Sequence, residues 1–99
     1  MTLPELQDLI RQMYGWKDSN RGAEGTFLWF CEEVGELAGA LRESDFDALE
    51  AEFADVLAWL ATLANVKGVD LSRAIEKKYG SGCPGCGKII CACGKSVKP

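Results

Sequence analysis

The sequence predicts an all-α protein: a compact bundle of about four helices, followed by a short tail rich in cysteine. Apolar residues recur at helical spacing along residues 1–79, and no alternating β-branched run indicates a strand. Four of the five cysteines lie in the last 17 residues, which carry no helical periodicity. We therefore divide the chain into a helical domain, residues 1–79, and a tail, residues 80–99.

The first helix is expected over residues 2–13, where Thr2 can act as the N-cap and Pro4 suits the first turn. Residues 15–25 contain three glycines and several turn-forming residues, a composition typical of a loop. Such a loop is long for a connection within a compact domain, and long loops often carry functional residues.

Two long helices are expected next, over residues 26–43 and from the turn at residues 44–45 to about residue 66. The residues expected to face the core from the second helix are Phe27, Phe30, Cys31, Val34, Leu37, Ala38 and Leu41. Those of the third helix are Leu49, Phe53, Val56, Leu57, Leu60, Leu63 and Ala64. A short fourth helix over residues 71–79 has Asp70 as its N-cap and ends at Gly80.

Composition and charge exclude several classes of function. A chain of 99 residues can form only a small hydrophobic core, so we expect a bound metal or a partner subunit to contribute to its stability. The net charge of −4 argues against a protein that mainly binds nucleic acid, and the absence of histidine excludes Ser-His-Asp and Cys-His catalysis. No secretory signal opens the chain, and the longest apolar run is shorter than the ~20 residues of a membrane span. We expect a cytoplasmic protein.

Two pairs of acidic residues lie beside the expected core stripes of the long helices. Glu33 and Glu36 are three residues apart on one helix, and Glu52 and Asp55 have the same spacing on the next. Antiparallel packing would make the pairs face each other. Four converging carboxylates need a cation, and oxygen ligands without histidine or cysteine select Mg²⁺ or Mn²⁺. Because acidic residues on helices are more often solvated, the spacing alone leaves both interpretations open.

Residues 32–37 (EEVGEL) and 52–57 (EFADVL) together resemble the EExxE…ExxD signature of the MazG-like nucleotide pyrophosphohydrolases. These enzymes belong to the all-α NTP pyrophosphatase superfamily, with the dimeric dUTPases and dCTP pyrophosphatases. The resemblance covers about residues 3–79. It implies Mg²⁺-dependent hydrolysis of nucleoside triphosphates, NTP or dNTP, to the monophosphate and pyrophosphate, with removal of non-canonical nucleotides as one role. It also implies a homodimer or homotetramer.

The resemblance also assigns roles to individual residues. It implies that the metal ligands are Glu33, Glu36, Glu52 and Asp55. Glu32, beside the catalytic Glu33, is the candidate that positions or deprotonates the attacking water, and Lys78 is the candidate phosphate contact. The alternative for Lys78 is a solvated residue favoured by the helix dipole, and Lys77 could take its place.

Two further residues are candidates for substrate binding. Arg21, in the expected loop, could contact phosphate or base, or face solvent. Trp29 shares the carboxylate stripe and could stack on a nucleobase, whereas core packing is the better expectation for the other aromatic residues considered: Trp16, Phe27 and Trp59. The Asn and Arg that follow the lysine in many family members are missing. Either Lys88 or Lys95 replaces them, or the efficiency and substrate differ.

The tail contains Cys83, Cys86, Cys91 and Cys93 in a CxxC…CxC array. Four thiolates suit tetrahedral Zn²⁺, and a cytoplasmic chain disfavours disulfides. A redox dithiol, an iron–sulfur cluster and a tail without metal remain alternatives, and the tight spacing leaves room for ligands shared across a dimer. Cys31 is expected to be a buried thiol.

The alternative function is that of a non-catalytic dimeric adaptor, whose zinc-binding tail contacts protein or nucleic acid. The clustered carboxylates argue against it, and the negative charge disfavours nucleic acid as the partner. A narrower enzyme, specific for dUTP or dCTP, is a second alternative. Base selectivity would lie in residues 15–25 and in the shape of the pocket.

Overall fold

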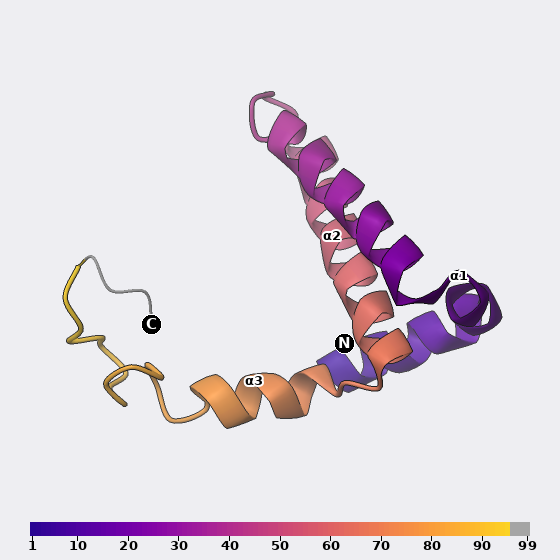
Figure 1. Cartoon of the computed structure of the whole chain (residues 1–99). Coiled ribbons are helices and arrows are strands. Elements are labelled where there is room, and N and C mark those ends of the chain that lie inside the picture. Colours follow the sequence, from indigo (N-terminus) through magenta and orange to yellow (C-terminus); the bar gives the residue numbers. More distant parts are fainter. Residues whose placement is uncertain (96–99) are drawn as a thin grey trace. The chain divides into compact units, whose positions relative to one another are not determined.

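The computed structural model describes residues 1–95, and within this range every regular element is a helix (Figure 1). Three helices follow one another: α1 (Leu3–Ala40), α2 (Phe46–Lys67) and α3 (Leu71–Tyr79). The predicted all-α class is therefore confirmed. The chain forms two compact units, the first comprising Met1–Val69 and the second beginning at Asp70.

The start of α1 follows from its capping residues. The Thr2 side chain accepts a hydrogen bond from the Glu5 backbone amide at 3.2 Å, and the Glu5 carboxylate accepts one from the Thr2 amide at 3.0 Å. This reciprocal capping box satisfies two amides that the first helical turn leaves without partners.

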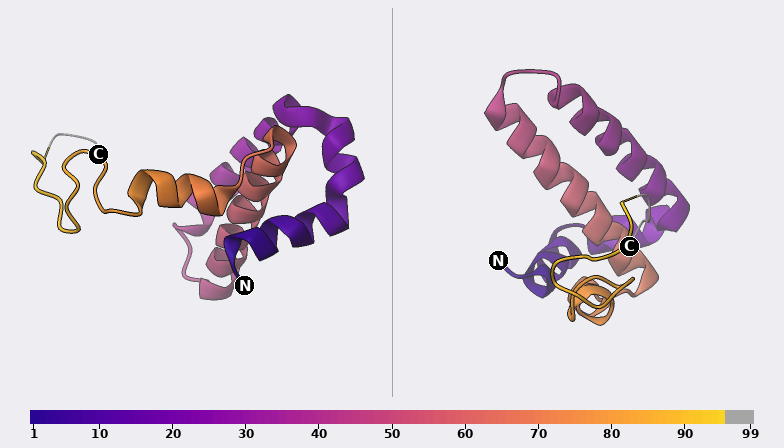
Figure 2. Two further views of the ribbon diagram at one scale, coloured as in Figure 1. Left: turned by 90° about the horizontal axis from the view of Figure 1, so that it is seen from below. Right: turned by 90° about the vertical axis from the view of Figure 1, so that its left-hand side faces the viewer.

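α1 breaks sharply at Gly22, where φ is 77° and ψ is 178°. On both sides of Gly22 the backbone is helical, so the prediction of a loop over residues 15–25 is wrong (Figure 2). The first two predicted helices are two segments of one element. Glycine in a helix costs only about 1 kcal/mol, and this segment also contains the buried side chains of Asp18 and Thr26, both bonded to Arg21. The positive φ at Gly22 explains why the break falls at a glycine.

The second segment of α1 runs antiparallel to α2, and a short connection joins them (Figures 1 and 2). Asp45 caps α2 by accepting a hydrogen bond from the Ala48 amide at 3.1 Å, and Gly68 ends the helix in the left-handed conformation. The first segment of α1 is tied to the end of α2 by side-chain amides. Gln7 donates to the Asn65 side chain and to the Val69 carbonyl, both at 2.9 Å.

The core of this first unit is small. Its buried apolar residues are Ile10, Ala40, Ala61 and Ala64. Several residues that the sequence predicted to face the core are exposed instead: Phe27, Cys31, Val34, Ala38, Leu41, Phe53, Leu57 and Leu60. A helical hairpin covers only the faces that its two helices turn toward each other, so the rest of each apolar stripe stays open to solvent.

α3 begins at the predicted N-cap Asp70, whose carboxylate accepts a hydrogen bond from the Arg73 amide at 3.0 Å. It ends before Gly80, whose amide donates to the Glu76 carbonyl at 2.9 Å. Residues 81–95 then form turns and bends without helix or strand. Among the helices of the described residues, none is long and apolar enough to span a membrane.

Candidate functional site

Three carboxylates meet where the second segment of α1 packs against α2. Oxygens of Glu33, Glu36 and Glu52 lie within 4.8 Å of one another. The two residues of α1 share a face because they are three positions apart, and the antiparallel hairpin brings Glu52 opposite them. Asp55, one turn further along α2, is near enough for its charge to raise the pKa of both Glu33 and Glu52.

The acidic cluster formed by Glu33, Glu36 and Glu52 is electrostatically unfavourable without a cation. Desolvation, followed by the charge of Glu36, raises the pKa of Glu33 to about 7. Desolvation and the charges of Glu36 and Asp55 also raise the pKa of Glu52. Within residues 1–95, one buried oxygen of Glu33 and one of Glu52 lack any hydrogen-bond partner. Crowded carboxylates with buried unpartnered oxygens fit a hard divalent cation.

Two of the residues expected to act in catalysis lie outside this cluster. Glu32 is exposed and is not among the three mutually close carboxylates. Lys78 belongs to the second unit, where its ammonium nitrogen lies 5.6 Å from the centroid of the Tyr79 ring. Their roles stay predictions.

A pocket of about 460 Å³ lies beside the acidic cluster, with Asp55 in its lining. Its walls come from the first segment of α1 and from α2, and include Tyr14, Lys17 and Trp59. A pocket of this size is within the range of small-molecule sites.

Arg21 is held in place within this pocket. Its guanidinium carbon lies 4.9 Å from the centroid of the Trp59 ring, and its Nε donates to the Thr26 hydroxyl at 3.1 Å. It also forms an ion pair with Asp18, whose side chain is only 7% exposed. Trp59 in turn stacks on Trp29, with 6.1 Å between ring centroids and 19° between ring planes. The two sequence candidates Arg21 and Trp29 are therefore linked through Trp59.

Sequence reasoning missed Asp18. Its second carboxylate oxygen is buried and has no hydrogen-bond partner among the described residues, and the residue lines the pocket. The sequence does contain a signal for it, because Asp18 and Arg21 are three residues apart, a spacing at which oppositely charged side chains pair on a helix. The expectation of a loop over residues 15–25 concealed this relationship.

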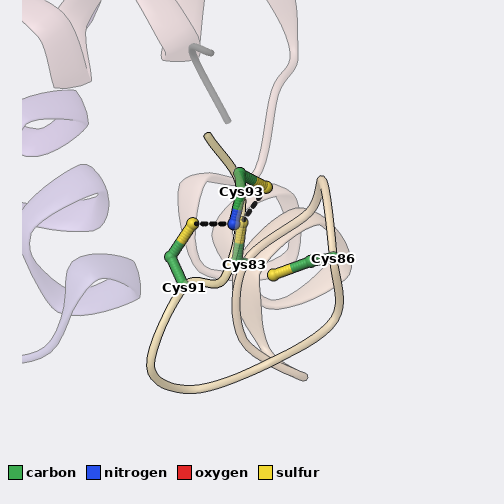
Figure 3. A group of neighbouring side chains, drawn as sticks. All are labelled: Cys83, Cys86, Cys91 and Cys93. Carbon is green, nitrogen blue, oxygen red and sulfur yellow. Dashed lines mark hydrogen bonds between the residues drawn. The ribbon is translucent and has the colours of Figure 1, made fainter. Parts of the chain in front are cut away.

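The second unit contains a cysteine cluster. The sulfurs of Cys83, Cys86, Cys91 and Cys93 all lie within 4.8 Å of one another (Figure 3). Hydrogen bonds from the Ala92 and Lys88 amides lower the pKa of Cys86 to about 6, whereas the sulfurs of its three neighbours raise the pKa of Cys93 to about 12. Cys31, predicted to be buried, is exposed on α1.

An all-α hairpin with carboxylates converging from both helices defines a class of helical protein with an acidic, metal-compatible site. The family model of the MazG nucleotide pyrophosphohydrolase domain matches residues 21–86, more than half of the chain. The chain therefore belongs to the MazG nucleotide pyrophosphohydrolase family, whose members are hydrolases acting on phosphoric anhydrides of nucleotides and typically depend on a metal. The match begins at Arg21 and includes the acidic cluster. The comparison with curated proteins finds no match.

Proposed function

We propose that this protein hydrolyses nucleoside triphosphates, NTP or dNTP, to the monophosphate and pyrophosphate in a Mg²⁺-dependent reaction. The observation that carries the proposal is the set of carboxylate oxygens of Glu33, Glu36 and Glu52 within 4.8 Å, two of these residues having a buried unpartnered oxygen. Removal of non-canonical nucleotides is one role for such an enzyme.

Mg²⁺ or Mn²⁺ fits the acidic cluster because all of its donors are hard carboxylate oxygens. The ligands would be Glu33, Glu36, Glu52 and Asp55. When bound, the cation would neutralise phosphate charge and make a coordinated water more acidic. Without it, desolvation and, after it, the charge of Glu36 raise the pKa of Glu33.

The pocket next to Asp55 would hold the rest of the nucleotide. Arg21 presents a charged guanidinium that Asp18 and Thr26 hold over Trp59, which suits recognition of a phosphate or of a base edge. Trp29 is 47% exposed and would offer a ring face to the base.

The proton of the attacking water needs an acceptor that is not a metal ligand. Glu32 is exposed and lies four residues before Glu36 on the same helix, a spacing that puts their side chains on one face and supports the proposal that the Glu32 carboxylate orients or deprotonates that water. Lys78, near the C-terminal end of α3, would contact a phosphate oxygen through its ammonium group.

The exposed apolar surface supports a homodimer or homotetramer. On α2, Phe53, Leu57 and Leu60 are spaced four and three residues apart and are 55%, 43% and 39% exposed. They therefore form one stripe that the hairpin leaves uncovered. Burying one such side chain fully contributes about 1.5–3 kcal/mol, so a second copy of the chain would stabilise this thin unit.

The experiment is a turnover assay of the purified protein on a panel of NTPs and dNTPs with Mg²⁺, in which the products are separated and identified. Monophosphate and pyrophosphate are expected, and Glu36→Gln is expected to abolish their formation. Glu43→Gln is the matched control, because Glu43 is exposed and lies outside the acidic cluster. Formation of diphosphate and phosphate, or no turnover by folded, metal-replete protein, would overturn the proposal, and the second result would favour the adaptor.

A further inference from the structure

We propose that the four cysteines of the second unit form a closed tetrathiolate site for one structural Zn²⁺ ion, separate from the acidic cluster of the first unit. The proposal rests on the convergence of Cys83, Cys86, Cys91 and Cys93, whose sulfurs lie within 4.8 Å of one another (Figure 3). It does not depend on the proposed hydrolase activity, because the two sites share no residue.

The spacing of the sulfurs fits a metal better than a disulfide. A tetrahedral site with Zn–S bonds of about 2.3 Å places its sulfurs about 3.8 Å apart. The Sγ atoms of Cys83 and Cys93 are 3.8 Å apart, whereas a disulfide requires about 2.05 Å. One chain supplies all four ligands, so the tight sequence spacing does not require a partner subunit.

The backbone around the first pair of cysteines is shaped as a tight turn. The Gly87 amide donates to the Cys83 carbonyl at 2.6 Å, and the Cys83 amide donates to the Lys88 carbonyl at 2.8 Å. Gly82 has a φ of 110°, and a Cβ atom there would lie 2.8 Å from that Lys88 carbonyl. Only glycine fits this position, so the turn is specified by the sequence.

Backbone amides also point at two of the sulfurs. The Ala92 amide donates to Cys86 Sγ at 3.4 Å, and the Cys93 amide donates to Cys91 Sγ at 3.3 Å. These hydrogen bonds hold the Cys86 and Cys91 sulfurs in place beside those of Cys83 and Cys93, as expected of groups that orient metal ligands.

Within this segment, residues 81–95, the large apolar side chains are not packed into a core. Ile89 and Ile90, its two large apolar residues, are 85% and 88% exposed, and residues 81–95 contain no helix or strand. Metal binding would thus supply the free energy that orders it. Four protein ligands leave no open coordination position, which makes the site structural rather than catalytic. Soft thiolates also select Zn²⁺ over the Mg²⁺ expected at the acidic cluster.

The test begins with the metal content of the full-length protein, purified under reducing conditions without added chelator. Native mass spectrometry and elemental analysis are expected to find one Zn²⁺ per chain. Replacement by Co²⁺ is expected to give the intense d–d bands of a tetrahedral ion and thiolate-to-cobalt charge-transfer bands. Cys86→Ser and Cys91→Ser are expected to lose the metal. Cys31→Ser, which changes the one cysteine outside the cluster, is expected to retain it.

Trypsin provides a second measurement that does not depend on variants. Lys88 lies between the two cysteine pairs, so metal should protect the bond after it and chelation should expose that bond. Four outcomes would overturn the proposal: protein without bound zinc, iron with inorganic sulfide in place of zinc, a cobalt spectrum without thiolate charge transfer, or cleavage after Lys88 at the same rate with and without metal.

Discussion

The guanidinium of Arg21 lies over the ring of Trp59, with 4.9 Å between its central carbon and the ring centroid. Asp18 and Thr26 hold the same guanidinium by an ion pair and a hydrogen bond. Arg21 is thus oriented before any ligand arrives, at the wall of a pocket whose lining also contains Asp55, which lies one turn along α2 from Glu52 of the acidic cluster. Such preorganisation would reduce the ordering cost of binding the nucleotide proposed for this pocket.

Substituting Arg21→Lys should weaken substrate binding. Lysine keeps the charge but loses the planar contact with Trp59 and the fork that reaches both Asp18 and Thr26. We expect KM to rise about tenfold, in line with a loss of about 1–2 kcal/mol, with a smaller change in kcat. Arg11→Lys is the matched control, because Arg11 pairs with Asp8 at the same helical spacing on an exposed face. Equal effects of the two substitutions would contradict a binding role for Arg21.

Substituting Glu52→Gln should abolish most of the activity. It removes a carboxylate from the acidic cluster. Residues that only hydrogen-bond to metal ligands typically cost about 10–100-fold when they are mutated, and we expect a larger fall in kcat/KM here. The measurement is pyrophosphate release at saturating Mg²⁺. Glu50→Gln serves as the control, since Glu50 is exposed on the same helix and lies outside the cluster. Wild-type activity of Glu52→Gln would remove this residue from the site.

The stability of the protein without divalent cations should depend on pH through Glu33. Its pKa is raised from 4.5 to about 7 in the folded protein, so the folded state holds a proton that the unfolded chain releases. The contribution of Glu33 to stability therefore falls as the pH rises from about 4.5 to about 7 and is constant above that range. Thermal unfolding in buffers without Mg²⁺ should show this decline, and Glu33→Gln should reduce it. If Glu33→Gln leaves the pH dependence of stability unchanged, the decline does not come from Glu33.

The break in α1 predicts opposite effects for two glycine substitutions. Gly22→Ala should destabilise the protein by about 1 kcal/mol or more, because φ is 77° there and L-residues avoid that region. Gly15→Ala should stabilise it by up to about 1 kcal/mol, because Gly15 is helical and a Cβ there meets nothing within 4 Å. Denaturant unfolding of both variants provides the comparison. Stabilisation by Gly22→Ala would mean that the break is absent in solution.

The exposed stripe on α2 predicts how assembly can be disrupted. Leu57→Lys places a charge in the middle of the stripe formed with Phe53 and Leu60, and should shift the protein toward monomer in light scattering coupled to gel filtration. Ala51→Lys is the control and should leave the assembly unchanged. It introduces the same charge at an exposed position that, by its helical spacing, lies on the opposite side of α2. If the wild type is monomeric, or if both variants dissociate equally, the stripe is not the interface.

Local patterns in the sequence predicted most of the helices and the convergence of the four cysteines. Of the four carboxylates predicted to converge, Glu33, Glu36 and Glu52 lie close together, and Asp55 lies outside that group. Spacings of three residues within Glu33–Glu36 and Glu52–Asp55 are sufficient to place carboxylates on one helix face, and the short turn before α2 makes the helices antiparallel. The CxxC…CxC pattern likewise predicted that its four sulfurs could converge. Capping residues such as Thr2 and Asp70 located two helix starts, because their side chains satisfy specific backbone amides.

Longer-range effects were beyond the sequence pattern. Three glycines within residues 15–25 indicate a loop by composition, but only Gly22 leaves the helical conformation, and Asp18 within this range and Thr26 just after it are buried. Helical periodicity places Phe53 and Leu57 on one apolar face of the helix, but it does not determine which part of the protein packs against that face. The pocket wall formed by Arg21 and Trp59 requires a tertiary contact that no local spacing encodes.

The most direct test of the account follows Mn²⁺ binding and pyrophosphate release in the same samples. Electron paramagnetic resonance reports free Mn²⁺ while the assay reports turnover of a nucleoside triphosphate. If the acidic cluster holds the cation that hydrolysis requires, both should saturate at the same Mn²⁺ concentration, and Glu36→Gln should lose both while Glu43→Gln keeps both. Pyrophosphate release that persists in Glu36→Gln, or that needs no divalent cation, would contradict the account.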